Sequence, residues 1–394
     1  MPLLLQLNAT ANWGSTGRIA EQIGQTVMRN GWESYIAFGR YENPSYSHTL
    51  KVDKYINVLE HYAENRLFDN EGLASRTATR KLIKKIDIIH PDIIHLHNIH
   101  DHWLNYKILF EYLGTLATPI VWTFHDCWAF TGGCTHFETY GCNNWKSECN
   151  NCPQKRAFLY NQAQRNFNLK KEYFLKPKNL TIVPVSKWME RLVKKSFFKD
   201  THTICIQNGI DLDKFQPKEN TIQKYGAYVL GVASKWSNMK GFDDFIQLRK
   251  FLPKDISIIL IGLSIKQIKT LPQGIIGIQR TNNVEELASY YSNAVAFINP
   301  TYQDTFPTTN IETLACGTPV ITYNTGGSPE IIDEHTGIVV NKGDIQGLKD
   351  AIDIIIKKGK SAYTTLCRQR AEQHFNKDIC FQKYMELYES LISK

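Results

Sequence analysis

The stretch Asp304-Thr-Phe-Pro-Thr-Thr-Asn-Ile-Glu312-Thr-Leu-Ala-Cys-Gly317-Thr-Pro-Val320 decides how the rest of the chain is interpreted. It follows an apolar run, residues 294–300, which shows no polar alternation and therefore predicts a buried parallel strand. From Thr308 the residues predict a helix, whose first turn offers unpaired N–H groups and a positive dipole end to an anion. Two carboxylates, this helix and Gly326-Gly327 together indicate a site for an anionic ligand such as a nucleotide sugar. Each residue alone also fits an ordinary strand–loop–helix unit.

Length and composition are those of an ordinary globular protein. At 394 residues the chain exceeds one typical hydrophobic core, so two domains are expected. The apolar fraction of 42% and the charged fraction of 21% are typical of soluble domains. A formal net charge of +8 favours anionic ligands or an anionic membrane surface only weakly, and it does not predict a nucleic-acid partner.

The N-terminal residues predict a cytoplasmic location. Met1–Asn8 has neither the basic start nor the long apolar run of a secretory signal, so we interpret it as a first strand. No apolar window approaches the ~20 residues that span a bilayer. Peripheral contact with the cytoplasmic face of the membrane remains an open alternative at this stage.

Apolar runs alternate with helical patterns along both halves of the chain. This alternation predicts an α/β protein with two doubly wound, Rossmann-like domains that face a deep interdomain cleft. We expect an N-terminal domain at residues 1–212, a C-terminal domain at 213–375, and a helix at 376–394 that packs back on the N-terminal domain. The polar stretch 216–225 is the expected hinge. Ligands of such sheets bind at the carboxyl ends of the strands.

Two short motifs follow predicted strands of the N-terminal domain. Gly14 and Gly17 lie between the first strand and a helix, where backbone N–H groups can approach a phosphate, although a tight turn also explains them. His125 and Asp126 follow the strand Pro119–Phe124, a place where α/β proteins hold ligands; a histidine that bonds loop carbonyls is the alternative. Nearby, His95 and His97 share one face of a strand and suit either a metal or, as we prefer, a polar strand end.

Four cysteines are bunched between residues 134 and 152. Their order, with a terminal C-x-x-C, is that of a tetrahedral thiolate site, so we predict a structural zinc on Cys134, Cys142, Cys149 and Cys152. Free thiols are the first alternative and a disulfide pair is the second. A total of nine cysteines, an odd number, fits a reducing compartment.

The C-terminal domain offers groups that suit a nucleotide sugar. A carboxylate such as Glu312 can hold ribose hydroxyls, and Lys235 and Lys240 can meet a diphosphate. Asp304 lies one loop away, where it can meet the sugar. Either lysine alone also fits a surface charge.

Taken together, these motifs resemble those of the family-four retaining glycosyltransferases, which have the GT-B fold. The resemblance rests on Asn208-Gly-Ile-Asp211, Lys240-Gly241, Asp304-x7-Glu312 and Ala315-Cys-Gly-Thr-Pro319. The stretches Thr123–Trp128 and Cys134–Cys152 are similar to the bacterial branch that builds exopolysaccharide, capsule or O-antigen, including the colanic acid type. The resemblance covers nearly the whole chain.

The resemblance implies a role for each matching residue. Glu312 binds the ribose, Asp304 meets the donor sugar, and Lys240 and Lys235 bind the diphosphate. His125 contacts the sugar near the reacting carbon, and the glycine turn approaches donor and acceptor. Two departures matter, because Asp304 replaces the family's common Glu and Lys235 replaces its usual Arg. The further expected contacts are Arg280, Thr305, Phe306, Thr308 and Thr309 on the donor side, and His97, Asn98, Asp126 and Ser186 on the acceptor side.

The implied reaction is transfer of a hexose from a UDP- or GDP-sugar to a glycan or lipid-linked oligosaccharide, with retention and without a catalytic metal. For a lipid-linked acceptor, the basic stretch Lys187–Lys195 and the basic end near Arg80 are candidate membrane contacts, with a solvated face as the alternative. Two other functions compete with the transferase. One is a sugar-nucleotide epimerase or hydrolase, whose acid/base pair would be His125 with Asp126. The other is a non-catalytic carbohydrate- or lipid-binding module.

Overall fold

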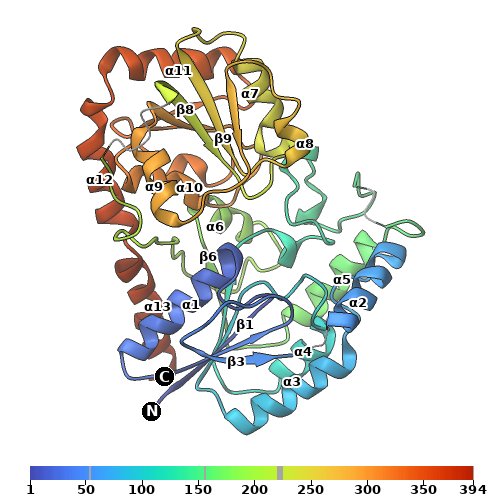
Figure 1. The fold of residues 1–394 in the computed structure, drawn as a ribbon. Coiled ribbons are helices and arrows are strands. Elements are labelled where there is room, and N and C mark those ends of the chain that lie inside the picture. Colours follow the sequence, from blue (N-terminus) through green and yellow to red (C-terminus); the bar gives the residue numbers. More distant parts are fainter. Residues whose placement is uncertain (53–54, 155–156, 220–224, 394) are drawn as a thin grey trace. The chain divides into compact units, whose positions relative to one another are not determined.

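The computed structural model describes residues 1–52, 55–154, 157–219 and 225–393. The chain divides into two compact units: unit 1 comprises Met1–Ile206 and Phe381–Lys394, and unit 2 comprises Gln207–Cys380. The sequence analysis placed these divisions after residues 212 and 375, and part of its predicted hinge, 220–224, lies outside the described residues. Each unit is an α/β domain built on a parallel sheet, which confirms the predicted fold class (Figure 1).

Unit 1 is built on a seven-stranded parallel sheet, as far as its described residues show, in the order β3-β2-β1-β4-β5-β6-β7. The strands are β1 (Leu3–Asn8), β2 (Glu33–Phe38), β3 (His48–Lys51), β4 (Ile93–Leu96), β5 (Ile120–Phe124), β6 (Leu180–Pro184) and β7 (His202–Thr203). The helices are α1 (Gly14–Arg29), α2 (Tyr55–Phe68), α3 (Arg76–Ile89), α4 (Tyr106–Leu113), α5 (Ala163–Phe174), α6 (Lys187–Val193) and the part of α13 (Lys377–Ile392) that begins at Phe381.

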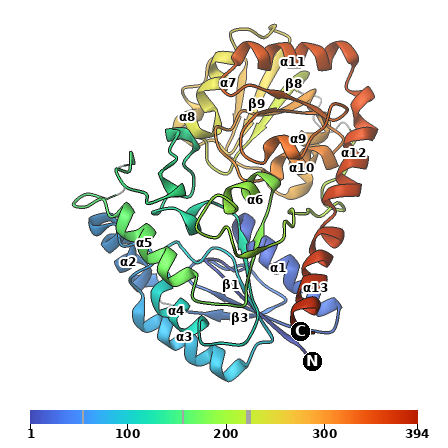
Figure 2. The same ribbon diagram turned by 180° about the vertical axis from the view of Figure 1, so that it is seen from behind.

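Successive residues of β1 supply the two cores of unit 1. Leu4 packs with Ile23 of α1 and with Tyr384 and Tyr388 of α13 on one face of the sheet. Leu5 packs on the other face, in a cluster rich in aromatic side chains that includes Trp122. Side chains of a strand alternate between faces, so a continuous apolar run serves a sheet covered on both sides. Figures 1 and 2 both show α1 beside the red C-terminal helix.

Unit 2 is built on a parallel sheet whose described strands follow the order β10-β9-β8-β11-β12-β13. The strands are β8 (Ala227–Val232), β9 (Ile256–Ile261), β10 (Ile275–Ile278), β11 (Ala296–Asn299), β12 (Val320–Tyr323) and β13 (Gly337–Val340). The helices are α7 (Phe242–Leu248), α8 (Ile265–Ile268), α9 (Val284–Asn293), α10 (Thr308–Ala315), α11 (Ile345–Lys358) and α12 (Ser361–Phe375). Helix α10 packs against α9 and α12, and Figure 2 shows the three together.

Several local predictions are confirmed by these bounds. The apolar run at 294–300 contains the buried strand β11, and the helix after it begins at Thr308. The basic stretch Lys187–Lys195 is helical from Lys187 to Val193, where α6 ends. None of the described helices is long and apolar enough to cross a membrane.

Candidate functional site

Two histidines meet at the carboxyl edge of the sheet in unit 1. His97 directly follows β4 and His125 directly follows β5, and these strands are parallel neighbours. Parallel neighbours end at the same edge, so the two side chains emerge together. Nδ1 of His97 lies 3.1 Å from Nε2 of His125, and the rings are stacked at 20°. Both residues were predicted for the site, but their contact was not.

Gln6 of β1 sets the proton positions in this pair. Its Nε2 donates to the carbonyl oxygen of Ala20 at 2.8 Å, which orients the amide. Its Oε1 therefore accepts the Nε2–H of His97, at 3.0 Å. With that proton on Nε2, Nδ1 of a neutral His97 can only accept, and the donor it accepts from is Nε2–H of His125. The chain of bonds leaves Nδ1 of His125 unprotonated.

Burial keeps both rings neutral at pH 7. It lowers the pKa of His97 well below its usual value, and the charges of His95 and His125 lower it further. Burial also lowers the pKa of His125, to about 4, although the carboxylate of Asp126 acts in the opposite direction. Nδ1 of His125 has no hydrogen-bond partner among the described residues. His125 can therefore accept a hydrogen bond from a ligand hydroxyl.

His95 has a structural role within unit 1. Its Nε2 is 2.8 Å from Oγ1 of Thr123, and its Nδ1 is 2.6 Å from the hydroxyl of Tyr388 on α13. Both ring nitrogens thus have protein partners, which fits the polar strand end preferred for His95 and His97 over a metal pair.

Asp126 pairs with His100 rather than with the adjacent His125. Its Oδ2 lies 2.9 Å from Nε2 of His100, and its Oδ1 accepts the N–H of Trp128 at 2.8 Å. Burial alone would lower the pKa of His100, but the carboxylates of Asp126 and Asp101 hold it well above its usual value. Burial would raise the pKa of Asp126, and His100 lowers it instead. The two residues form an ion pair, so Asp126 is already engaged.

Asn98 and Ser186, both predicted for the acceptor side, also lie just after strands of unit 1. The backbone N–H of Asn98 donates to Oδ1 of Asn8 at 3.2 Å, which ties the ends of β4 and β1 together. Ser186 is buried and caps α6, because its hydroxyl oxygen accepts the N–H of Met189 at 3.1 Å. A capping role is sufficient to explain Ser186.

The two glycines of the first loop differ in their surroundings. Gly14 has φ +68 and opens α1, whose N-terminus has no side-chain cap, and an added Cβ at Gly14 would meet nothing within 4 Å. At Gly17 an added Cβ would lie 2.7 Å from Oγ1 of Thr10. Gly17 therefore packs the helix against the loop, whereas Gly14 leaves the start of α1 open.

In unit 2, Lys240 and Asp304 form an ion pair at the carboxyl edge of the sheet. Lys240 Nζ lies 2.7 Å from Asp304 Oδ2. Lys240 ends a short 3₁₀ turn after β8, and Asp304 lies in the loop after β11, the parallel neighbour of β8. The two predicted residues therefore bind each other.

Glycines allow the close backbone approaches around this pair. Gly241 has φ +73, and an added Cβ there would lie 2.4 Å from the carbonyl oxygen of Pro300. Gly326 has φ +54, and its added Cβ would lie 1.7 Å from the carbonyl oxygen of Asp304. The N–H of Gly327 donates to that same oxygen at 3.2 Å. Residues 326–327 thus fix the backbone of Asp304.

Glu312 projects from α10 and is held by a buried tyrosine. The hydroxyl of Tyr291 donates to Oε2 of Glu312 at 2.9 Å. Burial raises the pKa of Tyr291 well above its usual value, and the charge of Glu312 adds to the effect, so the phenol keeps its proton. The N-cap of α10 is Pro307, and no side chain caps the helix. The first-turn N–H groups at Thr308 and Thr309 are free of side-chain caps.

Three buried polar atoms between Thr305 and Ser328 lack a hydrogen-bond partner in the described part of the chain: Thr305 Oγ1, Asn310 Nδ2 and Ser328 Oγ. Native proteins leave few such atoms unpaired, and a bound water or ligand is the usual reason. Phe306, between them, is buried with its ring centroid 6.0 Å from that of Phe375.

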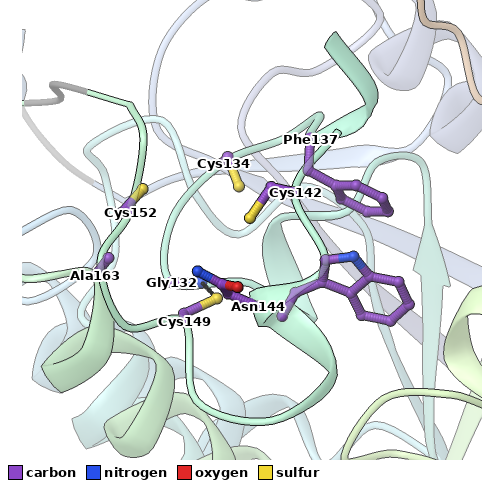
Figure 3. Close-up of a pocket in the computed structure, with 9 residues that line it drawn as sticks. Gly132, Cys134, Phe137, Cys142, Asn144, Cys149, Cys152 and Ala163 are labelled. Atoms are coloured by element: carbon purple, nitrogen blue, oxygen red, sulfur yellow. Dashed lines mark hydrogen bonds between the residues drawn. The ribbon is translucent and has the colours of Figure 1, made fainter. Parts of the chain in front are cut away.

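The remaining predicted residues do not join these contacts. Lys235 and Arg280 are exposed, and neither has a partner in the described part of unit 2. The four cysteines at 134–152 line one cavity in unit 1 (Figure 3). The structure thus pairs His97 with His125 and Lys240 with Asp304. The side chain of Asp126 pairs with His100 and not with the neighbouring His125.

Comparison with known sequence families identifies the family of this chain. Residues 16–214, half of the chain, match the sequence model of Glycosyltransferase Family 4. The chain belongs to Glycosyltransferase Family 4. Residues 227–358 of the same glycosyltransferase match a second model, described as Glycosyl transferases group 1.

Two curated relatives of this glycosyltransferase come from bacterial polysaccharide pathways. The putative colanic acid biosynthesis glycosyl transferase WcaC of Escherichia coli (strain K12) is 25% identical over 162 residues, 38% of this chain and 39% of the relative. The capsular polysaccharide biosynthesis glycosyltransferase CapM of Staphylococcus aureus is 27% identical over 207 residues, 48% of this chain and 54% of the relative. The chain therefore spans about half of these relatives or less.

Solved structures share the fold over the whole chain. Sucrose-phosphate synthase from Thermosynechococcus elongatus superposes with a TM-score of 0.74 at 17% identity and covers 100% of both chains. Anabaena Alr3699/HepE in complex with UDP-glucose superposes with a TM-score of 0.64 at 15% identity and covers 98% of this chain and 99% of the other. Identities this low establish the fold alone, which is GT-B, as predicted.

Three residues that hydrogen-bond to predicted site residues were not predicted from the sequence. Gln6 orients His97, His100 holds Asp126, and Tyr291 holds Glu312. Gln6 left a signal, because it is the one polar residue in the run Leu3–Leu7 and is fully buried. His100 is one of five histidines between residues 90 and 102, but no local pattern indicates its partner. Tyr291 left no signal beyond a helical pattern.

Proposed function

We propose that this glycosyltransferase moves a hexose from a nucleoside diphosphate sugar to a saccharide acceptor during assembly of a bacterial surface polysaccharide. Its likeness to WcaC and CapM supports the pathway. The likeness of its fold to HepE, solved with UDP-glucose, supports a sugar nucleotide as donor, with UDP favoured over GDP. The observation that carries the proposal is the arrangement of α10, which carries Glu312 and follows the loop that holds Asp304.

Helix α10 presents complementary groups at a spacing that suits a nucleotide. Its N-terminus lacks a side-chain cap, so its N–H groups and positive dipole end can receive the diphosphate. Glu312 follows four residues after Thr308, about 6 Å further along the helix axis. A carboxylate there can accept both ribose hydroxyls while the phosphates meet the helix start. The hydrogen bond from Tyr291 restricts Glu312 to one orientation.

Lys240 and Asp304 bind different parts of the donor. The ammonium of Lys240 balances the negative charge that grows on the departing diphosphate, and the exposed Lys235 adds to it. Asp304 accepts hydroxyls of the transferred sugar. Their ion pair holds both groups in place before the donor binds, because each restrains the rotamers of the other. Since the cations come from the chain itself, we propose that turnover needs no catalytic metal.

His125 serves as a hydrogen-bond acceptor rather than as an acid. A pKa of about 4 leaves the ring neutral at pH 7, so it has no spare proton to give. Its unprotonated Nδ1 accepts a hydroxyl hydrogen bond from the sugar near the reacting carbon. The competing epimerase or hydrolase would use His125 with Asp126 as an acid/base pair, but Asp126 is bound to His100. The geometry therefore favours transfer over epimerisation or hydrolysis, and we propose that the transfer retains the anomeric configuration.

The proposed acceptor is a glycan, with a lipid-linked oligosaccharide as its specific form, and the proposed location is cytoplasmic with peripheral membrane contact. None of the nine cysteines is part of a disulfide, which suits a reducing compartment. On α6, Lys187 and Lys194 both pair with Glu190, at 3.0 Å and 2.9 Å. Arg191 and Lys195 are exposed beside them and are the groups we propose for contact with an anionic surface.

A donor panel tests the proposal. The purified chain is incubated with UDP- and GDP-sugars, with and without a bacterial lipid extract, and nucleoside diphosphate is measured. Transfer requires release that depends on the acceptor, and NMR of the product must show the anomeric configuration of the donor. Product from the donor alone would instead support an epimerase or hydrolase. Binding without turnover would support a carbohydrate- or lipid-binding module.

A further inference from the structure

The loop between β5 and α5 surrounds a small cavity lined with sulfur. Cys134, Cys142, Cys149 and Cys152 line it together with Gly132, Phe137, Asn144, Trp145 and Ala163. Figure 3 shows the four cysteine side chains drawn around this space. The cavity measures about 10 Å³, which is room for roughly one water-sized body. None of the four cysteines is part of a disulfide.

We propose that this cavity binds one structural Zn²⁺ through the four cysteine thiolates. A closed set of four sulfur ligands is typical of structural zinc sites. Because all four positions are taken by protein ligands, the ion has no open position and its role is to stabilise the loop.

The loop has little else to hold it. Between Thr131 and Gln162 its described residues form only two 3₁₀ turns, at Glu138–Tyr140 and Asn144–Lys146. Its apolar core is small: Trp145 packs against Phe137 at 4.9 Å and against Phe130 at 5.4 Å between ring centroids. A segment of this kind buries too little surface to offset the entropy of ordering it, and a metal ion commonly supplies the difference.

Groups around the sulfurs suit a negatively charged metal centre. The backbone N–H of Gly132 donates to Sγ of Cys149 at 3.2 Å, the kind of bond that stabilises a ligating thiolate. The ammonium of Lys170 is buried under the start of the loop, where it donates to the carbonyl oxygens of Trp128 at 2.7 Å and Thr131 at 3.2 Å. Four thiolates and Zn²⁺ carry a net charge of about −2, and Lys170 offsets part of it.

The four sulfurs still have to move closer to bind the ion. With Zn–S bonds of about 2.3 Å, a tetrahedron places its sulfurs roughly 3.8 Å apart. The four cysteines are not among the groups of three or more potential metal ligands whose ligand atoms lie within 4.8 Å of one another in the described residues. The group that meets this distance is Glu71, His100 and Asp101. That group is an ion-pair cluster, since His100 is held protonated by Asp101 and Asp126. A protonated imidazole is no metal ligand.

The site would also brace the predicted active-site edge of unit 1. The N–H of Cys127 donates to the carbonyl oxygen of Thr135 at 2.9 Å, and the hydroxyl of Thr131 donates to that of Cys134 at 2.6 Å. Cys127 directly follows Asp126. Fixing Cys134 therefore fixes the segment that begins at His125.

Metal analysis of the full chain tests the proposal. Protein purified without chelator is assayed for zinc by mass spectrometry, with the double variant Cys149→Ser/Cys152→Ser and, as a matched control, Cys205→Ser, which lies outside the cavity. We expect about one zinc per chain in the wild type and the control, and at least a tenfold loss in the double variant. Less than a tenth of a zinc per wild-type chain, even after incubation with zinc under reducing conditions, would overturn the proposal. A disulfide among the four cysteines, or zinc that persists in the double variant, would overturn it as well.

Two measurements on the wild type keep the test valid if the double variant fails to fold. Cobalt substituted for zinc should give thiolate-to-cobalt charge-transfer absorption of the intensity that four thiolates produce; absence of that band contradicts the assignment. Chelation should speed tryptic cleavage after the exposed Lys146 at least fivefold, and added zinc should restore protection. Cleavage that does not respond to chelation or zinc would show that no metal orders the loop.

Discussion

Lys240 Nζ lies 2.7 Å from Asp304 Oδ2, so the cation expected to meet the donor diphosphate and the acid expected to meet the donor sugar are bound to each other. The pair is partly exposed, with 39% of the lysine side chain and 23% of the aspartate side chain accessible. An ion pair of this exposure contributes about 1 kcal/mol or less to stability. The contribution of this ion pair to folding is therefore small.

Asp304→Asn should lower kcat by roughly 10- to 100-fold while the Kd for free nucleoside diphosphate changes less than threefold. The reason is that Asp304 meets the sugar, and a hydrogen bond to a charged group contributes about 1.5–3 kcal/mol. Steady-state kinetics and calorimetric binding give the two values, and the melting temperature should change little. Lys250→Ala, an exposed lysine of the same unit, is the control. Parallel loss of turnover and nucleotide affinity would contradict the assigned role.

Glu312→Ala should weaken nucleotide binding roughly 10- to 100-fold, because the ribose hydroxyls lose a charged acceptor. The wild type should also bind the 2′-deoxy form of the nucleotide less tightly than the ribose form, and the variant should lose that preference. Tyr291→Phe should weaken the preference without abolishing it, since it removes the bond that orients Oε2. If Glu312→Ala keeps the full ribose preference, Glu312 does not contact the ribose.

The stability of the chain should rise as the pH rises from about 4 to 6.5. His125 has a folded pKa of about 4 and an ordinary value of 6.5, so in this window the unfolded chain binds one more proton at this residue. The stabilisation is complete above pH 6.5 and is lost as the pH falls through this window, by about 1.4 kcal/mol per pH unit for each such group. His61, with a pKa lowered by burial to about 3, acts in the same sense.

Urea unfolding at several pH values measures this effect. His125→Gln should reduce the slope between pH 4 and 6.5 by about 1.4 kcal/mol per pH unit, which corresponds to one proton. His100 acts in the opposite sense: its raised pKa stabilises the fold at low pH, and that stabilisation is lost as the pH rises through the folded value, above 6.5. A slope that is the same in wild type and His125→Gln would refute the assigned protonation state.

Turnover should survive removal of divalent metal ions from the assay. The charge on the leaving diphosphate is expected to be balanced by Lys240, Lys235 and the start of α10, so EDTA should change kcat less than twofold. Zinc content is measured in the same samples, so that loss of the proposed structural ion is not mistaken for loss of a catalytic one. Activity that disappears while zinc stays bound, and that returns with magnesium, would contradict the prediction.

Arg191→Ala/Lys195→Ala should weaken co-sedimentation with vesicles rich in anionic lipid by about 30-fold, since each basic residue near such a surface contributes about 1 kcal/mol. Lys250→Ala/Lys254→Ala, which removes the same charge from exposed positions of unit 2, should bind like the wild type. Equal binding by both double variants would exclude α6 as the contact.

The succession of strands and helices along the chain could be predicted from the sequence because its signals are local. The same holds for the placing of candidate site residues after the carboxyl ends of strands. A continuous apolar run placed β11, and Thr308 marked the start of α10, which carries Glu312. The end of α6 at Val193 could not be predicted in this way, because charged residues such as Lys194 and Lys195 fit a helix or a solvated turn equally well.

The sequence by itself determined the two parallel α/β domains, their family, and the residues at the strand ends, because periodicity and motif spacing record them. The tertiary structure alone decided which side chains pair with one another. Gln6 bonds His97 across 91 residues, His100 takes Asp126 from the adjacent His125 across 26, and Lys240 meets Asp304 across 64. Each partnership depends on which strands lie side by side: the order β1-β4-β5 brings Gln6, His97 and His125 to one edge, and β8 beside β11 brings Lys240 to Asp304. Strand order is set by packing of the whole sheet, and no local pattern encodes it.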